Sequence, residues 1–179
     1  MAEELPAAPE NRAAFSCERW IMPAIERFAG EHRFLSNFHP SPIWFEGVSY
    51  PTVEHAYQAA KSDDFEEKLR IASVESPGVA KRLGRRLVPR RDWEECRVFV
   101  MEELVRAKFA RHADLRRRLL DTGDAELIEG NNWCDRFWGV CGGVGENRLG
   151  RILMQIREEF CDQEAAERQD QREPLLLAK

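Results

Sequence analysis

No apolar run in the 179-residue sequence approaches the roughly 20 residues that a membrane-spanning helix needs. The segment from Met1 to Ala14 is rich in alanine, glutamate and proline, and it lacks the basic and apolar regions of a signal peptide. We therefore expect a cytoplasmic protein that has no membrane partner.

Paired cysteines are also missing. The sequence has five cysteines, an odd number, and none of them has C-x-x-C spacing. This argues against a disulfide framework and against a structural zinc site. His55 has no second histidine or cysteine at helical ligand spacing, so we expect neither a metal nor a cofactor.

A large positive charge is absent too, since the net charge is −5, which does not favour tight nonspecific binding of nucleic acid. The charge is uneven, however. The stretch from Lys81 to Arg118 contains 13 Lys and Arg residues against 6 Asp and Glu. A charged helical surface is the usual cause of such a bias, and a basic face that receives phosphates is the alternative.

The hydrophobic content of 43% predicts a folded domain with its own core. Aromatic and β-branched residues in 28–38 and 43–50 indicate two short extended segments, with Glu46-Gly47 as a turn in the second. A further short strand is expected at Leu127-Ile128. The β component is therefore small.

Most of the remaining sequence predicts helices. Thr52, Asp64, Ser76 and Asp92 are the expected N-terminal caps or starts. The expected helices are 53–61, 64–73, 77–86, 93–111, 113–120 and 148–160. We predict an α+β fold in which a single mainly helical domain spans residues 28–160. It is preceded by an extension, 1–27, and followed by a polar tail, 161–179, which is expected to fray.

One predicted helix places three functional side chains on a single face. Glu54, Gln58 and Lys61 are separated by four and then three residues, which brings them to the same side. In a cleft, such a carboxylate can act as a general base, and a desolvated lysine can form an imine with a sugar. A solvated charged face is the alternative.

The stretch from Asp135 to Gly150 carries the second candidate group. Asp135 and Trp138 are three residues apart, and a glycine-rich loop, 142–145, leads into the last predicted helix at Arg148. Glycines allow close approach of a ligand, and a helix start suits a phosphate. Trp138 is interpreted as a ring that stacks on a heterocycle, with core packing as the alternative.

Several of these segments occur together in one known family. The sequence contains Phe34-Leu35-Ser36-Asn37-Phe38, Tyr50-Pro51-Thr52-Val53-Glu54-His55-Ala56-Tyr57-Gln58-Ala59-Ala60-Lys61, Asp135-Arg136-Phe137-Trp138-Gly139 and Asn147-Arg148-Leu149-Gly150, in this order. This pattern resembles the YbiA-like N-glycosidase family, also called the NADAR superfamily, over residues 28–160.

The resemblance implies an enzyme that hydrolyses N-glycosidic bonds of phosphorylated ribosylamine-type small molecules, such as early riboflavin-pathway intermediates, or of ADP-ribose attached to guanine. ADP-ribosylated nucleic acid is then a further partner. The positions implied as catalytic are Glu54, Lys61 and Asp135. Those implied to bind substrate are Ser36, Asn37, Trp138, Asn147 and Arg148. A non-catalytic module that binds ADP-ribose or an NAD-like nucleotide is the alternative.

Overall fold

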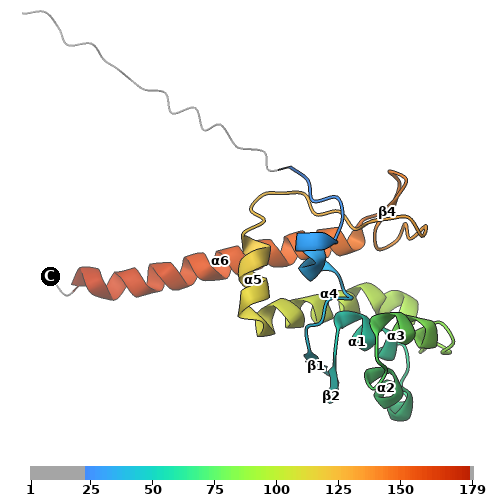
Figure 1. The fold of residues 1–179 in the computed structure, drawn as a ribbon. Coiled ribbons are helices and arrows are strands. Elements are labelled where there is room, and N and C mark those ends of the chain that lie inside the picture. Colours follow the sequence, from blue (N-terminus) through green and yellow to red (C-terminus); the bar gives the residue numbers. More distant parts are fainter. Residues whose placement is uncertain (1–22, 178–179) are drawn as a thin grey trace, which may run out of the picture.

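The computed structural model describes residues 23–177, and it describes side chains as far as residue 170. Helices dominate, and two small sheets accompany them, which confirms the predicted α+β class (Figure 1). The elements are η1 (Gly30–Leu35), β1 (Ile43–Phe45), β2 (Val48–Tyr50), α1 (Val53–Ala59), α2 (Phe65–Ala72), α3 (Pro77–Gly84), α4 (Trp93–Arg111), α5 (Ala113–Leu120), β3 (Gly130–Asn131), β4 (Val140–Cys141) and α6 (Arg148–Leu177).

The helix starts follow the predicted caps in three cases. The side chains of Thr52, Asp64 and Ser76 accept backbone hydrogen bonds at the starts of α1, α2 and α3. These bonds satisfy N–H groups that a helix start leaves free. Asp92 precedes α4 as predicted but makes no side-chain cap bond. Its carboxylate instead accepts two hydrogen bonds from Arg90, at 2.6 and 2.7 Å.

The second predicted extended segment is a hairpin. Strands β1 and β2 pair antiparallel, with Ile43 opposite Tyr50. Glu46 and Gly47 both have positive φ angles, 46° and 79°, at the turn. Positive φ at both central residues matches the twist of the two flanking strands. The turn predicted at Glu46-Gly47 is therefore confirmed.

The first predicted extended segment, 28–38, is wrong, because its middle forms the 3-10 helix η1. Gly30 has a positive φ of 56° at its start. The carbonyl groups of Phe34 and Ser36 accept hydrogen bonds from the buried ammonium of Lys108, at 2.6 and 2.9 Å. These carbonyl groups thus accept hydrogen bonds from a side chain that is distant in the sequence, and not from a neighbouring strand.

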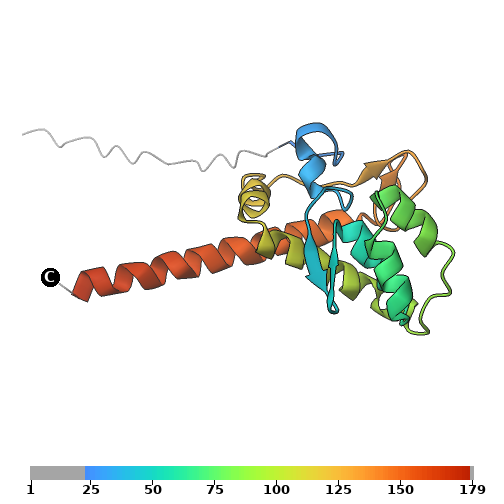
Figure 2. The ribbon, with the colours of Figure 1, turned by 60° about the horizontal axis from the view of Figure 1, so that its bottom comes forward.

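Helix α4 lies at the centre of the packing and contacts α1, α5, α6 and β1 (Figures 1 and 2). Its buried residues include Met101, Leu104 and Phe109, each at most 1% exposed. Helix α1 packs in turn against α2 and α3. The resulting core fixes α1 and α3 side by side, and both carry residues of the site described below.

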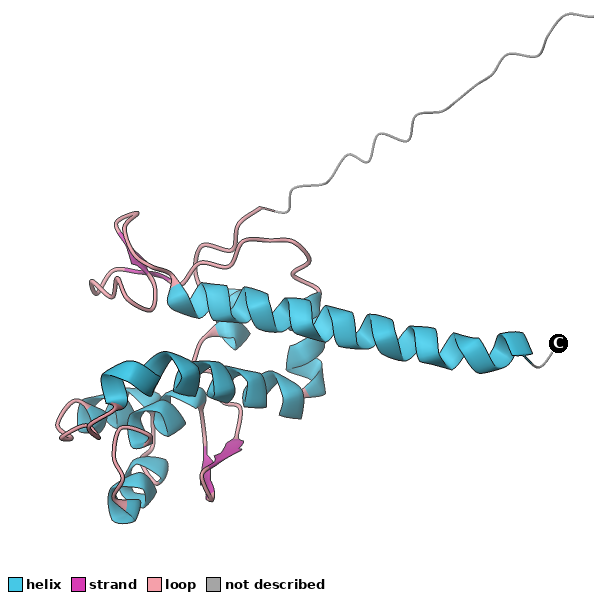
Figure 3. Cartoon of the chain, turned by 180° about the vertical axis from the view of Figure 1, so that it is seen from behind, coloured by secondary structure: helices cyan, strands magenta, loops and turns pink. Residues whose placement is uncertain are grey.

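The predicted end of the last helix at Phe160 is wrong, since α6 continues to Leu177 and projects beyond the rest of the described chain (Figures 1 and 3). Residues 161–170 contain no glycine or proline, and Glu, Gln, Ala and Arg favour helix. Side chains there are mostly exposed. No helix among residues 23–177 combines the length and apolarity needed to cross a bilayer.

The chain before Phe28 joins the helical domain where the structure describes it. Ile25 N–H donates to the carbonyl of Glu126 at 2.8 Å, and Ile128 N–H donates to the carbonyl of Ile25 at 2.9 Å. Leu127 therefore forms an isolated bridge with Ile25, and the regular pairing of β3 begins only at Gly130. Residues 1–22 of the predicted extension lie outside the described residues.

Candidate active site

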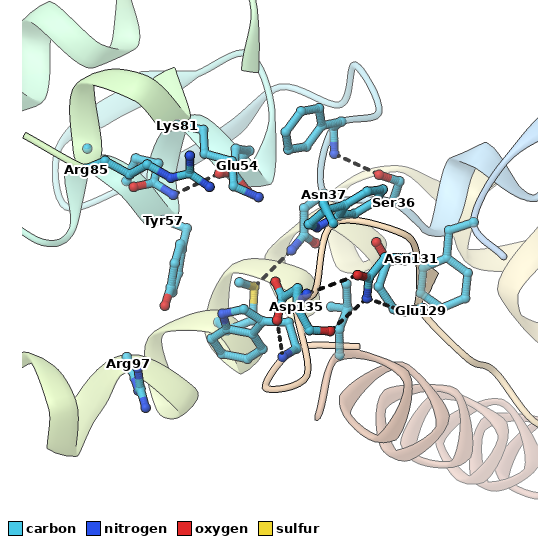
Figure 4. A pocket seen from close by; sticks show the side chains of 18 of the residues that line it. Ser36, Asn37, Glu54, Tyr57, Lys81, Arg85, Arg97, Glu129, Asn131 and Asp135 are labelled. Carbon is cyan, nitrogen blue, oxygen red and sulfur yellow. Dashed lines mark hydrogen bonds between the residues drawn. The ribbon is translucent and has the colours of Figure 1, made fainter. Parts of the chain in front are cut away.

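A cavity of about 940 Å³ opens between η1, α1, α3, the start of α4 and the segment 129–138 (Figure 4). Six of the eight predicted site residues line it: Ser36, Asn37, Glu54, Lys61, Asp135 and Trp138. The fold thus gathers side chains from segments that are far apart in the sequence.

Glu54 lies on α1 and is 5% exposed. Its Oε1 accepts a hydrogen bond from the amide of Gln58 at 2.8 Å, one helical turn later, as the predicted spacing requires. Burial raises the pKa of the Glu54 carboxyl, and Asp135 adds to this, whereas Lys81, the Gln58 hydrogen bond and Lys61 act in the opposite direction. The carboxyl is therefore more easily protonated than one in water.

Lys61 lies in the turn after α1 rather than on the helix itself. Its Nζ stands 5.7 Å from the ring centre of Tyr57 and 6.0 Å from that of Trp93. Burial lowers the pKa of the Lys61 ammonium. Lys81 and Arg85 lower it further, and Glu54 raises it. Two basic residues of the α3 region thus act in the same direction as burial.

Ser36 and Asn37 follow η1, and Lys108 donates a hydrogen bond to the carbonyl of Ser36. The carbonyl of Asn37 accepts from the N–H of Glu54 at 3.1 Å, which ties this turn to the start of α1. The side-chain Oδ1 of Asn37 is buried and has no hydrogen-bond partner among the described residues. The same is true of Gln58 Oε1 within residues 23–170. Both amide oxygens belong to residues that line the cavity.

Asp135 is positioned by the side chain of Asn131. Asn131 Nδ2 donates to the carbonyl of Asp135 at 2.7 Å, and Asn131 Oδ1 accepts from the Asp135 N–H at 3.0 Å. The carboxylate Oδ1 of Asp135 in turn accepts from the N–H groups of Phe137 and Trp138, at 3.2 and 2.9 Å. These bonds close a tight turn that fixes the acid beside the indole.

Aromatic rings form one side of the cavity. Trp138 makes edge-to-face contacts with Tyr57 and Phe137, with ring centres 5.5 and 4.9 Å apart. Tyr57 also contacts Trp93 at 5.1 Å. Trp138 is partly buried and packs against the core, as the alternative interpretation predicts, and it also lines the cavity. Its stacking on a heterocycle stays a prediction.

The two remaining predicted residues lie elsewhere. Asn147 is 9% exposed, and its side chain bonds to the backbone of Leu127 and Glu129, at 2.8 and 3.0 Å. Arg148 forms an ion pair with Glu146 at 2.7 Å and stacks 4.5 Å above the ring of Phe137. Neither lines the cavity, nor does the glycine-rich loop 142–145.

Sequence reasoning did not single out several charged residues that line the cavity, among them Lys81, Arg85, Arg97 and Glu129. Lys81 and Arg97 lie within the basic stretch, but their helices carry other basic residues that point elsewhere, so the sequence alone did not single them out. Glu129 directly follows the apolar pair Leu127-Ile128. The position of this acid at the end of a predicted strand was the sequence feature that could have identified it as a site residue.

No cluster of three or more His, Cys, Asp or Glu residues in the described part of the chain has the arrangement of a metal site. The cavity wall instead offers carboxyl, ammonium, guanidinium and amide groups together with aromatic rings. Such a set suits an organic anion that has a ring and hydroxyl groups.

Comparisons with known proteins identify the family of this chain. The model of the NADAR domain matches residues 26–161. The chain belongs to the NADAR domain family.

Individual relatives carry related names. N-glycosidase YbiA of Escherichia coli is 46% identical over 129 residues, which cover 70% of this chain and 80% of that protein. N-glycosidase Npun_R5314 of Nostoc punctiforme is 44% identical over 133 residues, or 84% of its length. The riboflavin biosynthesis protein VVA0006 of Vibrio vulnificus is 45% identical over 132 residues, but these span only 36% of that protein.

A solved structure has the same fold. The NMR structure of the E. coli protein YbiA superposes with a TM-score of 0.73 at 38% sequence identity. The match covers 81% of this chain and 89% of that one. The fold expected from the family resemblance is therefore confirmed.

Proposed function

We propose that this protein is an N-glycosidase that hydrolyses the C–N bond between a ribose carbon and the nitrogen of a base or amine in a phosphorylated substrate. One observation carries the proposal: a single cavity contains Glu54, Lys61 and Asp135 in a member of a family whose similar proteins are named N-glycosidases. Two substrate classes fit, ribosylamine phosphates of riboflavin biosynthesis and ADP-ribose linked to guanine.

Cleavage of this bond develops positive charge at the sugar carbon as the nitrogen departs. Carboxylates close to that carbon stabilise the charge and can take a proton from the attacking water. Glu54 and Asp135 face the cavity from α1 and from the turn at residues 131–135. We assign these two acids to charge stabilisation and proton transfer.

Lys61 supports a second step along the same path. An amine attacks a sugar carbonyl only when it is unprotonated, and burial favours the neutral form of this lysine. A ring-opened sugar can therefore be held as an imine on Lys61 until water releases it. The alternative role for this residue is that of a fixed positive charge beside a phosphate.

The rest of the cavity supports recognition of a phosphorylated ring. Trp138, braced by Tyr57, provides a face for stacking on a heterocycle. Lys81, Arg85 and Arg97 line the same cavity and carry the positive charge that a phosphate requires. This assigns phosphate binding to α3 and α4, in place of the start of α6.

The test is a side-by-side assay of base release from a ribosylamine phosphate and from ADP-ribosyl-guanine. The wild type is expected to turn over at least one of them. Glu54→Gln and Asp135→Asn should each lose about 10²–10⁴-fold in rate while still unfolding cooperatively on heating. Glu66→Gln, an exposed acid on α2, serves as the matched control.

Two results would contradict the proposal. Wild-type protein that binds ADP-ribose but releases no base from either substrate would identify a binding module instead. Near wild-type rates in both acid variants would remove Glu54 and Asp135 from the reaction.

A further inference from the structure

Glu129 is a third carboxyl group in the cavity, and the predicted site does not include it. It lies just before β3, and Figure 4 shows its side chain near Asp135 and Asn131. Its Oε2 atom is buried and has no hydrogen-bond partner in residues 23–170. An unpaired buried carboxyl oxygen costs free energy of folding, which a bound partner would offset. Glu129 lines the cavity, so its carboxyl group borders the space that a substrate would occupy.

The backbone of Glu129 is fixed from two sides. Its N–H donates to Oδ1 of Asn147 at 3.0 Å, and its carbonyl accepts from Val140 N–H at 2.9 Å. Gly139 lies so close to this carbonyl that a Cβ atom at position 139 would overlap it. Asn147 therefore acts on the site indirectly, because it positions Glu129.

The charged groups around Glu129 come from three elements. Burial raises the pKa of its carboxyl to about 7. Asp135 and Glu54 raise it as well, and Lys81 of α3 lowers it. A carboxyl in these surroundings keeps its proton at a pH where ordinary carboxyls have lost theirs, as a general acid must.

We propose that Glu129 is the acid that protonates the leaving nitrogen, an inference that rests on the proposed function. The C–N bond breaks and its electron pair stays on the nitrogen. Glu129 gives that nitrogen its proton and becomes a carboxylate. Water adds to the sugar carbon, and its proton passes to Glu54 or Asp135. One water is consumed, and the proton then returns to Glu129 through solvent.

The leaving group provides the test. A ribosylamine phosphate needs a proton on its departing nitrogen. In nicotinamide mononucleotide the departing nitrogen already carries a positive charge. It therefore leaves as a neutral base and needs no proton from the protein. Glu129→Gln should lose about 10²–10⁴-fold in kcat on the first substrate and less than about 10-fold on the second. The fall in wild-type kcat above about pH 7 should be absent in the variant.

Glu126→Gln is the matched control, because Glu126 is an exposed acid three residues earlier in the same segment. Melting temperatures are measured for all variants. Should Glu129→Gln not fold, Glu129→Asp keeps a carboxyl but shortens it, and it must show the same selective loss.

The outcomes separate the two proposals. Equal losses on both substrates, or a wild-type rate and pH profile in Glu129→Gln, would overturn the role of Glu129 and leave the N-glycosidase intact. A wild-type protein that releases no base would overturn both.

Discussion

Trp138 illustrates how one residue packs against the core and also lines a cavity. Its ring meets Tyr57 at an interplanar angle of 87° and Phe137 at 88°. Both contacts are edge-to-face, and the residue still lines the cavity. A ring held in this way loses little entropy when a ligand stacks on it.

Replacing Trp138 should separate these roles. Trp138→Ala is expected to weaken binding of ADP-ribose by about 10- to 100-fold, and Trp138→Phe by less, because phenylalanine keeps part of the stacking surface. Calorimetric titration measures affinity, and thermal unfolding measures stability. Trp44→Ala, at a tryptophan that is 63% exposed on β1, is the control. Affinity losses that merely follow lowered melting temperatures in both variants would assign Trp138 to the core alone.

Lys61 gives a second test at this scale. Burial, Lys81 and Arg85 lower its pKa more than Glu54 and Glu94 raise it, so a larger neutral fraction is expected than for a solvated lysine. Borohydride added during turnover should reduce the imine and leave a sugar adduct on Lys61, detected by mass spectrometry. Lys68, which pairs with Glu46 at 2.5 Å, should remain unmodified. If no adduct forms and Lys61→Arg retains substantial activity, the lysine acts only through its charge.

At the scale of elements, the start of α6 is tied to the segment before β3. Asn147 has a positive φ of 49°, and its side chain bonds to the backbone of Leu127 and Glu129. Gly150 lies against the same carbonyl of Leu127 and the amide of Asn147, where a Cβ atom would overlap both. The motif Asn147–Gly150 is thus a packing junction that sets the position of Glu129.

Alanine at two glycines tests this junction. Gly150→Ala should lower the free energy of unfolding by about 1–3 kcal/mol, because the added methyl group meets backbone that cannot move aside easily. Gly78→Ala, on α3, meets only ordinary contacts and should raise it by about 0.5–1 kcal/mol through reduced backbone entropy of the unfolded chain. Urea unfolding measures both. Equal effects of the two substitutions would contradict the junction.

At the scale of the whole molecule, the buried carboxyl groups of the cavity make the free energy of unfolding depend on pH. Glu129 has a folded pKa of about 7 and an ordinary value of 4.5. Since the folded pKa lies above the unfolded one, the unfolded chain releases the proton first as pH rises. The contribution of Glu129 to the free energy of unfolding is fully present below pH 4.5 and is lost as the pH rises to about 7. Burial raises the pKa of Glu54 as well, so its contribution has the same sign.

Glu129→Gln should remove this part of the pH dependence. Between pH 4 and pH 8, the free energy of unfolding of the variant should rise relative to wild type by about 3 kcal/mol. Urea unfolding at intervals of one pH unit gives the two curves. Glu126→Gln should run parallel to wild type, because its carboxyl is exposed. If the curves of Glu129→Gln and wild type also ran parallel, the pKa of the Glu129 carboxyl would not differ between the folded and the unfolded chain.

Local interactions are what the sequence by itself determined. The caps at Thr52, Asp64 and Ser76, the turn at Glu46-Gly47 and the hydrogen bond between Glu54 and Gln58 all join residues at most four positions apart. Spacing alone places such partners together. Spacing also singled out Glu54, Lys61, Asp135 and Trp138, and the family motifs added Ser36 and Asn37; all six line the cavity.

Only the tertiary structure decided the rest, because those interactions join distant segments. Lys108 reaches the carbonyl of Phe34 across 74 positions, and this contact accompanies a 3-10 turn where an extended segment was predicted. Glu129 titrates under the influence of Glu54, Asp135 and Lys81, which come from separate elements. Burial and long-range charge set the pKa of a carboxyl group, and neither can be inferred from the residues next to it in the sequence.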